Sequence, residues 1–375
     1  MALDNELMKK KTRNVNLDIL RILSMFLIVL LHSVDHSGVI EASTTSGDFI
    51  NWYTQTIFMF TRLAVNCYVL LSGYFLVKSQ FSFKKLLRLW IDVTFYSFII
   101  KFIFMIFDPS SVSIISLLSS FFSVTTGRYW FITIYFGLYL LSPFINKMIS
   151  ALSKKQHFSL LIILFILLSA TISIHPSIAG MNSGDGWGLT WFIFLYLTSS
   201  WIRLYYSPKY NKYIFLSIYS IISMLVGTVL FVTYKFNIPF VNTIVSNWYR
   251  YDSVPVYLSS ICLFLFFVDC NIKNVLLSKF ISKISSLTLG VYLIHAHPQL
   301  SPFIWDSLNL PQYMDKSIFP FIQIGVCIAI FSICIFIDYI KSKIFIPIDL
   351  IIEKSKIINK FNYFISNKFN LKTNK

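Results

Sequence analysis

Ten stretches of apolar residues, each close to the length that crosses a bilayer, divide this 375-residue chain. A helix needs roughly 20 apolar residues to span the hydrocarbon core, where the backbone must satisfy its own hydrogen bonds. The stretches lie at residues 17–35, 53–77, 87–107, 129–149, 157–175, 187–205, 212–235, 253–269, 284–300 and 318–340. This spacing predicts an all-α fold, a polytopic transmembrane helix bundle of about ten spans.

The composition supports this interpretation, and two segments leave the number of spans open. Hydrophobic residues make up 56% of the chain and charged residues only 13%, which is outside the range of soluble globular proteins. The span that starts near Val254 contains Pro255. The apolar stretch Val112–Val124 either crosses the membrane, re-enters it or lies along its interface.

Lysine and arginine residues are concentrated on one of the two predicted sides of the membrane. Twenty-five of them lie in the two terminal segments and in every second loop, whereas only four lie on the other side: Arg128, Lys235, Arg250 and Lys316. Positively charged loops stay in the cytoplasm, so both termini are predicted to be cytoplasmic. The same bias, with attraction to anionic membrane lipid, accounts for the net charge of +16 and makes a nucleic-acid partner improbable.

The first apolar stretch, LDILRILSMFLIVLLHS, contains three ionisable residues: Asp18, Arg21 and His32. At roughly 100° per residue, Arg21 and His32 lie within about 20° of each other around a helix, and Asp18 lies about 60° from Arg21. Each has an ordinary explanation when taken singly, namely a helix-start anion, a snorkelling arginine and an interfacial histidine. Together they form one polar stripe, and ionisable residues inside a span usually mark a functional path.

Two further groups of polar residues accompany the stripe. Arg62 and Asn66 are four residues apart, which predicts that they share a helix face, either lining a pore or bracing a helix contact. Lys85 and Arg88 start the third span, where they either hold phosphate groups or reflect the positive-inside bias.

Histidine and cysteine residues do not indicate a metal or disulfide framework. His295 and His297 are two residues apart, so they face different sides of a helix, and no carboxylate ligand is near in the sequence. We therefore predict no metal and expect His295 to line a pore. The five cysteines are odd in number and lie in or beside predicted spans without a CxxC pair.

The segment NLDILRILSMFLIVLLHS resembles the opening signature of the acyltransferase 3 family of bacterial integral membrane proteins. In that family an arginine, ten intervening residues and a histidine form the functional pair, which Arg21 and His32 match. Further resemblance runs through RLAVNCYVLLSGYFL, FKKLLRLW, YWFITIYFGLYLLSP and LGVYLIH. The family's basic pair is usually two arginines, where this chain has Lys85 and Arg88, and many relatives have an acid where this chain has Asn66.

The resemblance implies an acyl-CoA-dependent O-acyltransferase in the bacterial plasma membrane. Such an enzyme moves an acyl group, commonly acetyl, from cytoplasmic acyl-CoA to a hydroxyl of an extracytoplasmic polysaccharide or its lipid-linked precursor. The polysaccharide-modifying branch is the most similar. Acetyl-CoA would be a co-substrate and no cofactor would stay bound. We expect Lys85 and Arg88 to hold acyl-CoA, Arg21 to bind or polarise it, and His32 to act as the base, with Asp18 in support.

Two other functions and one domain boundary complete the predictions. A flippase or transporter for lipid-linked sugars would also need many spans, but it should show repeated halves, which this sequence lacks. A non-enzymatic component of a glycan-assembly complex would tolerate neutralisation of the stripe, and glycan-synthesis proteins are possible partners in either case. We divide the chain into a transmembrane acyltransferase domain (residues 1–345) and a basic cytoplasmic tail (residues 346–375).

Overall fold

The computed structural model describes residues 14–110, 112–174, 184–272 and 274–369, which form helices and turns and include no strand. Eight helical segments in this part of the chain are long and apolar enough to cross a membrane. They are α1 (Val15–Asp35), α3 with α4 (Asp48–Arg62 and Ala64–Leu76), α5 (Phe83–Phe107), α7 (Trp130–Ala151), α8 with η2 and α9 (Lys154–Phe165, Ile166–Ala170 and Thr171–Ile174), α11 (Lys212–Lys235), α14 (Val275–His295) and α16 (Phe319–Ile344). The all-α polytopic bundle is confirmed.

The other two predicted spans are shorter helices. They are α10 (Leu189–Tyr205) with 17 residues and α13 (Val254–Val268) with 15 residues. Pro255 stands in the first turn of α13, where its missing N–H is not needed, and Ser253 caps that helix. Ten spans therefore remain a prediction, as does the cytoplasmic location of the termini; residues 1–13 and 370–375 lie outside the described part.

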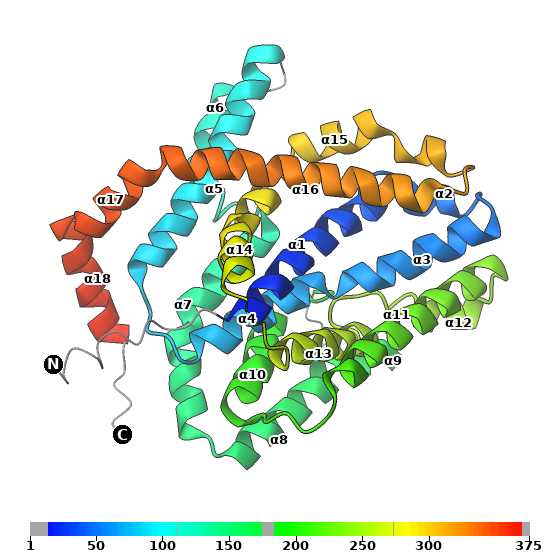
Figure 1. Ribbon diagram of the computed structural model, residues 1–375, viewed down its shortest axis with the longest axis horizontal. Helices are drawn as coiled ribbons and strands as arrows, with labels where there is room; N and C mark the ends of the chain where they lie inside the picture. Colours follow the sequence, from blue (N-terminus) through cyan, green and yellow to red (C-terminus); the bar gives the residue numbers. More distant parts are fainter. Residues whose placement is uncertain (1–13, 111, 175–183, 273, 370–375) are drawn as a thin grey trace.

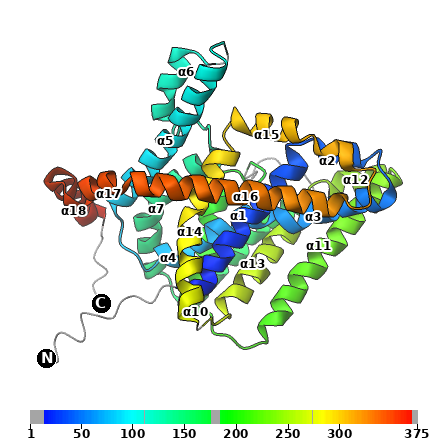
Figure 2. The same cartoon turned by 45° about the horizontal axis from the view of Figure 1, so that its top comes forward.

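The remaining helices are short or lie at the end of the chain. They are α2 (Val39–Ser43), α6 (Ile114–Leu118), η1 (Ser119–Phe122), α12 (Pro239–Val245), α15 (Leu300–Leu308), η4 (Leu310–Tyr313), α17 (Ile346–Lys354) and α18 (Lys356–Phe369). The stretch Val112–Val124 thus forms only α6 and η1, which are too short to cross a bilayer. Figure 2 shows α6 beyond the end of α5, projecting from the body of the bundle.

Two helices differ from the sequence prediction in ways that affect the site. The predicted span 284–300 is α14, which begins at Val275 because Asn274 caps it and ends at His295, three residues before Pro298. The hydropathy pattern missed this start because the first turns carry exposed lysines. The predicted span 53–77 begins earlier, at Asp48, and continues through a single turn residue, Leu63, whose backbone stays helical. Arg62 of α3 and Asn66 of α4 therefore remain on one face, and both contact Tyr251.

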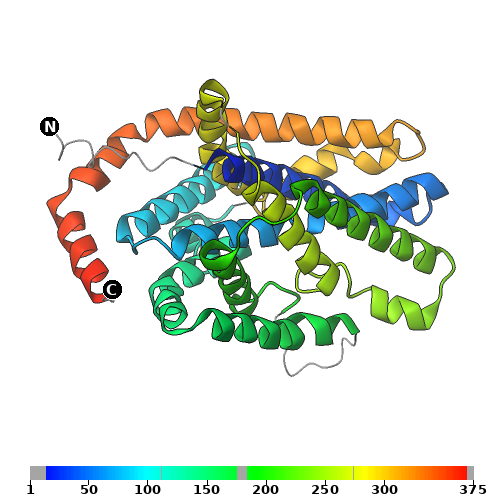
Figure 3. The same cartoon turned by 60° about the horizontal axis from the view of Figure 1, so that its bottom comes forward.

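Helix α1 lies at the centre of the bundle and contacts α3, α4, α13, α14 and α16 (Figure 1). Figure 3 shows α16 along one edge of the molecule and α8 along the opposite edge, with α1 and α4 between them. Leu17, Leu20 and Val29 of α1 have no exposed surface. Within a membrane protein, close packing against neighbouring helices is what favours the burial of such apolar side chains.

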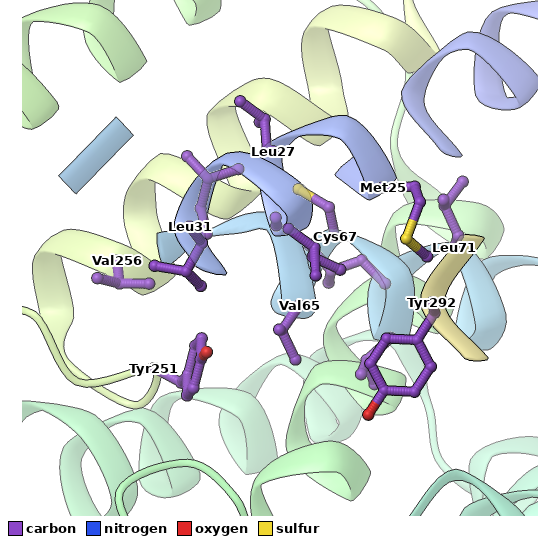
Figure 4. Packing of buried hydrophobic residues seen from close by; sticks show 14 of the residues in the cluster. Met25, Leu27, Leu31, Val65, Cys67, Leu71, Tyr251, Val256 and Tyr292 are labelled. Carbon is purple, nitrogen blue, oxygen red and sulfur yellow. The ribbon is translucent and has the colours of Figure 1, made fainter. Parts of the chain in front are cut away.

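Side chains of α1 and α4 interlock at the centre of the core. In Figure 4, Met25 of α1 lies beside Leu71 of α4, Tyr251 lies on the side of Leu31 of α1, and Val65 of α4 lies between these two groups. The opposite face of α4 approaches α10 closely at Gly73, where an added Cβ would stand 2.7 Å from the Tyr196 backbone. Close backbone approach at a small residue is a common way to pack helices in membranes. The two contacts fix α4 between α1 and α10.

The segment that follows α16 forms two helices that pack on α5. Figure 1 shows α17 and α18 together at one end of the molecule, beside the start of α5. The side-chain oxygen of Asn362 in α18 accepts a hydrogen bond from the Phe83 backbone N–H at 2.8 Å. This bond satisfies one of the free N–H groups at the beginning of α5. Residues 346–369 are therefore attached to the bundle through the helix that carries Lys85 and Arg88.

Candidate active site

A cavity of about 690 Å³ runs between α1, α4, α5, α7 and α14. At one end, which we call the Lys85 end, it is lined by Lys85, Leu76 and Tyr139. At the other, which we call the Arg128 end, it is lined by His36 and Arg128. Arg21 lies between, and His32 lies toward the Arg128 end, because α1 runs in that direction. The volume is typical of a site for a small organic ligand.

Arg21 and Asp18 form a fully connected polar cluster with α14. The Arg21 Nη1 atom lies 2.7 Å from an Asp18 carboxylate oxygen and 2.9 Å from the Ser285 hydroxyl. Ser282 and Ser285 each donate a hydrogen bond to the Asp18 carboxylate, at 3.0 and 2.9 Å. The Asp18 side chain is 4% exposed and that of Arg21 is 27% exposed. Asp18 thus orients Arg21, which alone of the two lines the cavity.

Three histidines gather at the other end of the polar stripe. The His32 ring stacks on His36, with centroids 4.3 Å apart, and stands 5.0 Å from the His295 ring. The buried atoms His32 Nδ1 and His295 Nε2 have no hydrogen-bond partner among the residues that the structure describes. His32 lines the cavity, whereas His295, which was expected to line a pore, does not. His295 is fully buried behind His32 and holds the Val291 carbonyl through Nδ1 at 2.5 Å.

Arg62 and Asn66 lie behind the cavity wall and hold it in place. The Arg62 guanidinium donates to the Tyr249 carbonyl at 2.9 Å and lies 3.7 Å from the Asp35 carboxylate. The Asn66 amide donates to the Tyr251 carbonyl at 2.9 Å. Neither is among the residues that line the cavity, whereas Asp35 and Tyr251 are. As their spacing of four residues predicts, both side chains reach the same loop.

Lys85 and Arg88 are separated by the structure, although both belong to α5. Lys85 lines the main cavity and has no ion pair within residues 14–369 as far as these are described. Arg88 pairs with Asp349 at 3.1 Å and with Glu353 at 2.6 Å, both on α17. It lines a second cavity of about 530 Å³ between α5, α14, α16 and α17. The two cavities share Ser286 and Leu289 in their walls.

Glu353 of α17 is the acidic partner of both Lys84 and Arg88. Hydrogen bonds from Lys84 and Arg88 hold the pKa of the Glu353 carboxyl below its ordinary value.

Within the described ranges, no three His, Cys, Asp or Glu side chains gather as a metal site would require. The main cavity can bind an elongated ligand with an anionic end near Lys85 and present the His32 and His36 imidazoles to it at the Arg128 end.

The model of one protein family, described as an acyltransferase domain, matches residues 14–339. The chain belongs to the acyltransferase 3 family. The match begins at Asn14, which caps α1, and ends within α16, so it covers every helix that lines the main cavity. No curated protein and no solved structure matches the chain significantly. The protein is therefore a multi-pass membrane acyltransferase.

Sequence reasoning missed several residues of this acyltransferase that contact the site. Ser282 and Ser285 are three residues apart, which places them on one helix face, and this spacing is the signal that could have identified them as partners of Asp18. Trp130, Trp187 and Tyr251 line the Arg128 end. The last two come from loops between helices, where no periodic pattern marks a residue that points inward.

Proposed function

We propose that this acyltransferase is a membrane O-acyltransferase that uses acyl-CoA, most simply acetyl-CoA, as donor. The acceptor is a hydroxyl of an extracytoplasmic cell-surface polysaccharide or of its lipid-linked precursor. The Lys85 end would face the cytoplasm and the Arg128 end the outside, in line with the alternation of basic loops. The protein would thus work in the bacterial plasma membrane, next to other glycan-synthesis proteins.

The observation that carries this proposal is that Lys85, Arg21 and His32 all line the main cavity. Arg21 and His32 are eleven residues apart on α1, or about 16 Å along the helix axis. A donor with a phosphate-bearing end, a long flexible arm and a terminal thioester fits that separation. The Lys85 ammonium supplies positive charge for the phosphate groups, and the apolar walls between Lys85 and His32 suit the arm.

The chemistry can be written for His32 as a general base. His32 takes the proton from the acceptor hydroxyl while the hydroxyl oxygen attacks the thioester carbonyl carbon. The carbon–sulfur bond then breaks, and the thiolate of CoA receives the proton from the imidazolium. Because Arg21 lies about 16 Å from His32 along α1, it would bind the donor arm and not the reacting carbonyl. In a variant with an acyl-histidine intermediate, His32 attacks the carbonyl first.

The proposal is tested on base-labile acyl esters of cell-surface polysaccharide, measured by mass spectrometry. Cells that lack the gene should lose these esters, the wild-type gene should restore them, and His32→Ala should not. The amount of tagged protein in the membrane serves as the control, because it must be equal for both forms. Esters that persist without the gene, or that His32→Ala restores fully, would overturn the proposal.

A further inference from the structure

Three aromatic side chains, two stacked tryptophans and a tyrosine tilted by 35° and 52° to them, meet at the Arg128 end of the main cavity. The Trp130 and Trp187 rings stack at 4.8 Å with an angle of 18° between them. Tyr251 stands 6.1 Å from Trp130 and 6.3 Å from Trp187. Trp187 is 46% exposed, so one of its faces covers Trp130 while much of the ring stays open. We call these three residues the aromatic platform.

The platform is held rigidly by contacts between two loops. Gly186 has φ +82°, and a Cβ there would lie 2.5 Å from the Tyr251 Cβ, so the turn before Trp187 requires glycine. Arg250 pairs with Asp185 at 2.8 Å and with Asp252 at 3.0 Å. The loop that carries Trp187 is therefore tied to the loop that carries Tyr251, and the platform exists before any ligand binds.

Polar groups surround the platform on the side of the reacting histidine. Arg128 lines the same end of the cavity and donates to the Ser119 hydroxyl at 2.5 Å, without a carboxylate partner in the part of the chain that is described. Asp35 and His36 also line this end, and His36 stacks on His32. The open part of the Trp187 ring is thus a flat apolar face, and hydrogen-bonding side chains line the same end of the cavity.

We propose that the aromatic platform binds one pyranose ring of the acceptor, with Arg128, Asp35 and His36 bonding its hydroxyls. A pyranose has an apolar face of C–H groups, whose partial positive charge is attracted to the negative face of an aromatic ring. Its edge carries hydroxyls, which match charged and imidazole groups. Stacking on Trp187 would turn one hydroxyl of the ring toward His32. This inference rests on the proposed function and specifies where its acceptor binds.

Saturation-transfer NMR tests the binding step without requiring catalysis. The probes are the methyl pyranosides of glucose, galactose and mannose, each compared with the acyclic polyol sorbitol, using protein in lipid nanodiscs. We expect transfer to the ring C–H protons of at least one glycoside, several times stronger than transfer to sorbitol. Trp187→Ala should reduce it at least fivefold, whereas Trp187→Phe should retain most of it.

The matched control is Trp90→Phe, a partly exposed tryptophan of α5 that does not line the cavity. It should leave transfer unchanged. Equal transfer in Trp187→Ala and wild type, or equal transfer to sorbitol and to all three glycosides, would overturn the inference.

An acylation assay separates this from failure of the proposed function: Trp187→Ala should raise the KM for the glycoside and leave the KM for acetyl-CoA unchanged. If wild-type protein binds glycosides but transfers no acyl group from acetyl-CoA, the proposed function fails while the platform stands.

Discussion

The two ends of the polar stripe on α1 are built in opposite ways. At the first end, Asp18 and Arg21 are linked to each other and to the hydroxyl groups of α14, so that the buried carboxylate accepts three hydrogen bonds. At the second end, His32 and His295 each keep a buried nitrogen that has no partner in the described residues. Both ends are formed by side chains of α1 and α14.

The difference indicates which end is structural and which is free to react. Hydrogen bonds that are fully made hold a side chain in one position, as a donor-binding arginine requires. An imidazole that makes few bonds is held less firmly by its neighbours, at a cost in stability that the surrounding packing must offset, and His32 is the one of these two histidines that lines the cavity. We therefore expect substitutions at the histidine end to affect the rate, and substitutions at the Asp18 end to affect stability as well.

The largest expected effect is on catalysis by His32. His32→Gln should lower the rate of acyl transfer about 10²- to 10⁴-fold, because a general base contributes an effect of that size. The measurement is acetyl transfer from acetyl-CoA by purified protein. The control is His157→Gln, a histidine that does not line the cavity and contacts the Leu197 carbonyl at 3.1 Å. A decrease of less than tenfold in His32→Gln would place the base elsewhere.

Asp18 provides the corresponding test at the other end. Asp18→Ala should lower the free energy of unfolding by about 2 to 4 kcal/mol, because it leaves the partly buried Arg21 charge without its partner. Ser282→Ala removes one hydrogen bond to the same carboxylate and should cost about 1 kcal/mol. Reversible denaturation in detergent measures both. If the two variants are equally stable, the Asp18–Arg21 pair contributes little.

His295 should separate stability from rate. His295→Phe should lower the free energy of unfolding by only about 1 kcal/mol, because it removes the Nδ1 bond to the Val291 carbonyl while the Nε2 atom makes no bond that would be lost. The rate of transfer should fall about tenfold, since the His295 ring stands 5.0 Å from His32 and the substitution removes its polar nitrogens from beside that imidazole. The same denaturation and transfer assays apply. A large loss of stability with an unchanged rate would reverse our assignment of this end.

The smallest effect concerns Glu353, whose carboxylate forms ion pairs with Lys84 and Arg88 at the start of α5. Its lowered pKa means that the stabilisation is present above the ordinary glutamate value of 4.5 and is lost as the pH falls through the lower pKa of the folded protein. The melting temperature of the wild type should therefore decrease more between pH 6 and pH 3 than that of Glu353→Gln. Parallel curves for the two proteins would show that the ion pairs with Lys84 and Arg88 do not stabilise the attachment of α17.

Much of the fold could be predicted because bilayer-length apolar stretches leave few alternatives. The stripe of Asp18, Arg21 and His32 depends only on helix periodicity. In the structure Arg21 and His32 line one cavity, so these two residues do lie on the same side of α1. The start of α14 could not be predicted, because exposed lysines conceal it from a hydropathy pattern. The separation of Lys85 from Arg88 could not be predicted either, because it depends on α17, which is distant in sequence.

The sequence by itself determined that this chain is a helical membrane protein of the acyltransferase 3 family, with an arginine and a histidine on one face of the first helix. The length of apolar stretches and local periodicity carry the fold and the shared helix face, and the motif resemblance carries the family. Only the tertiary structure decided which polar groups are satisfied and which are free, and that Trp130, Trp187 and Tyr251 meet at one end of the cavity. The physical reason is that hydrogen bonds and ring contacts across helices depend on distances between segments far apart in the chain, which no local pattern encodes.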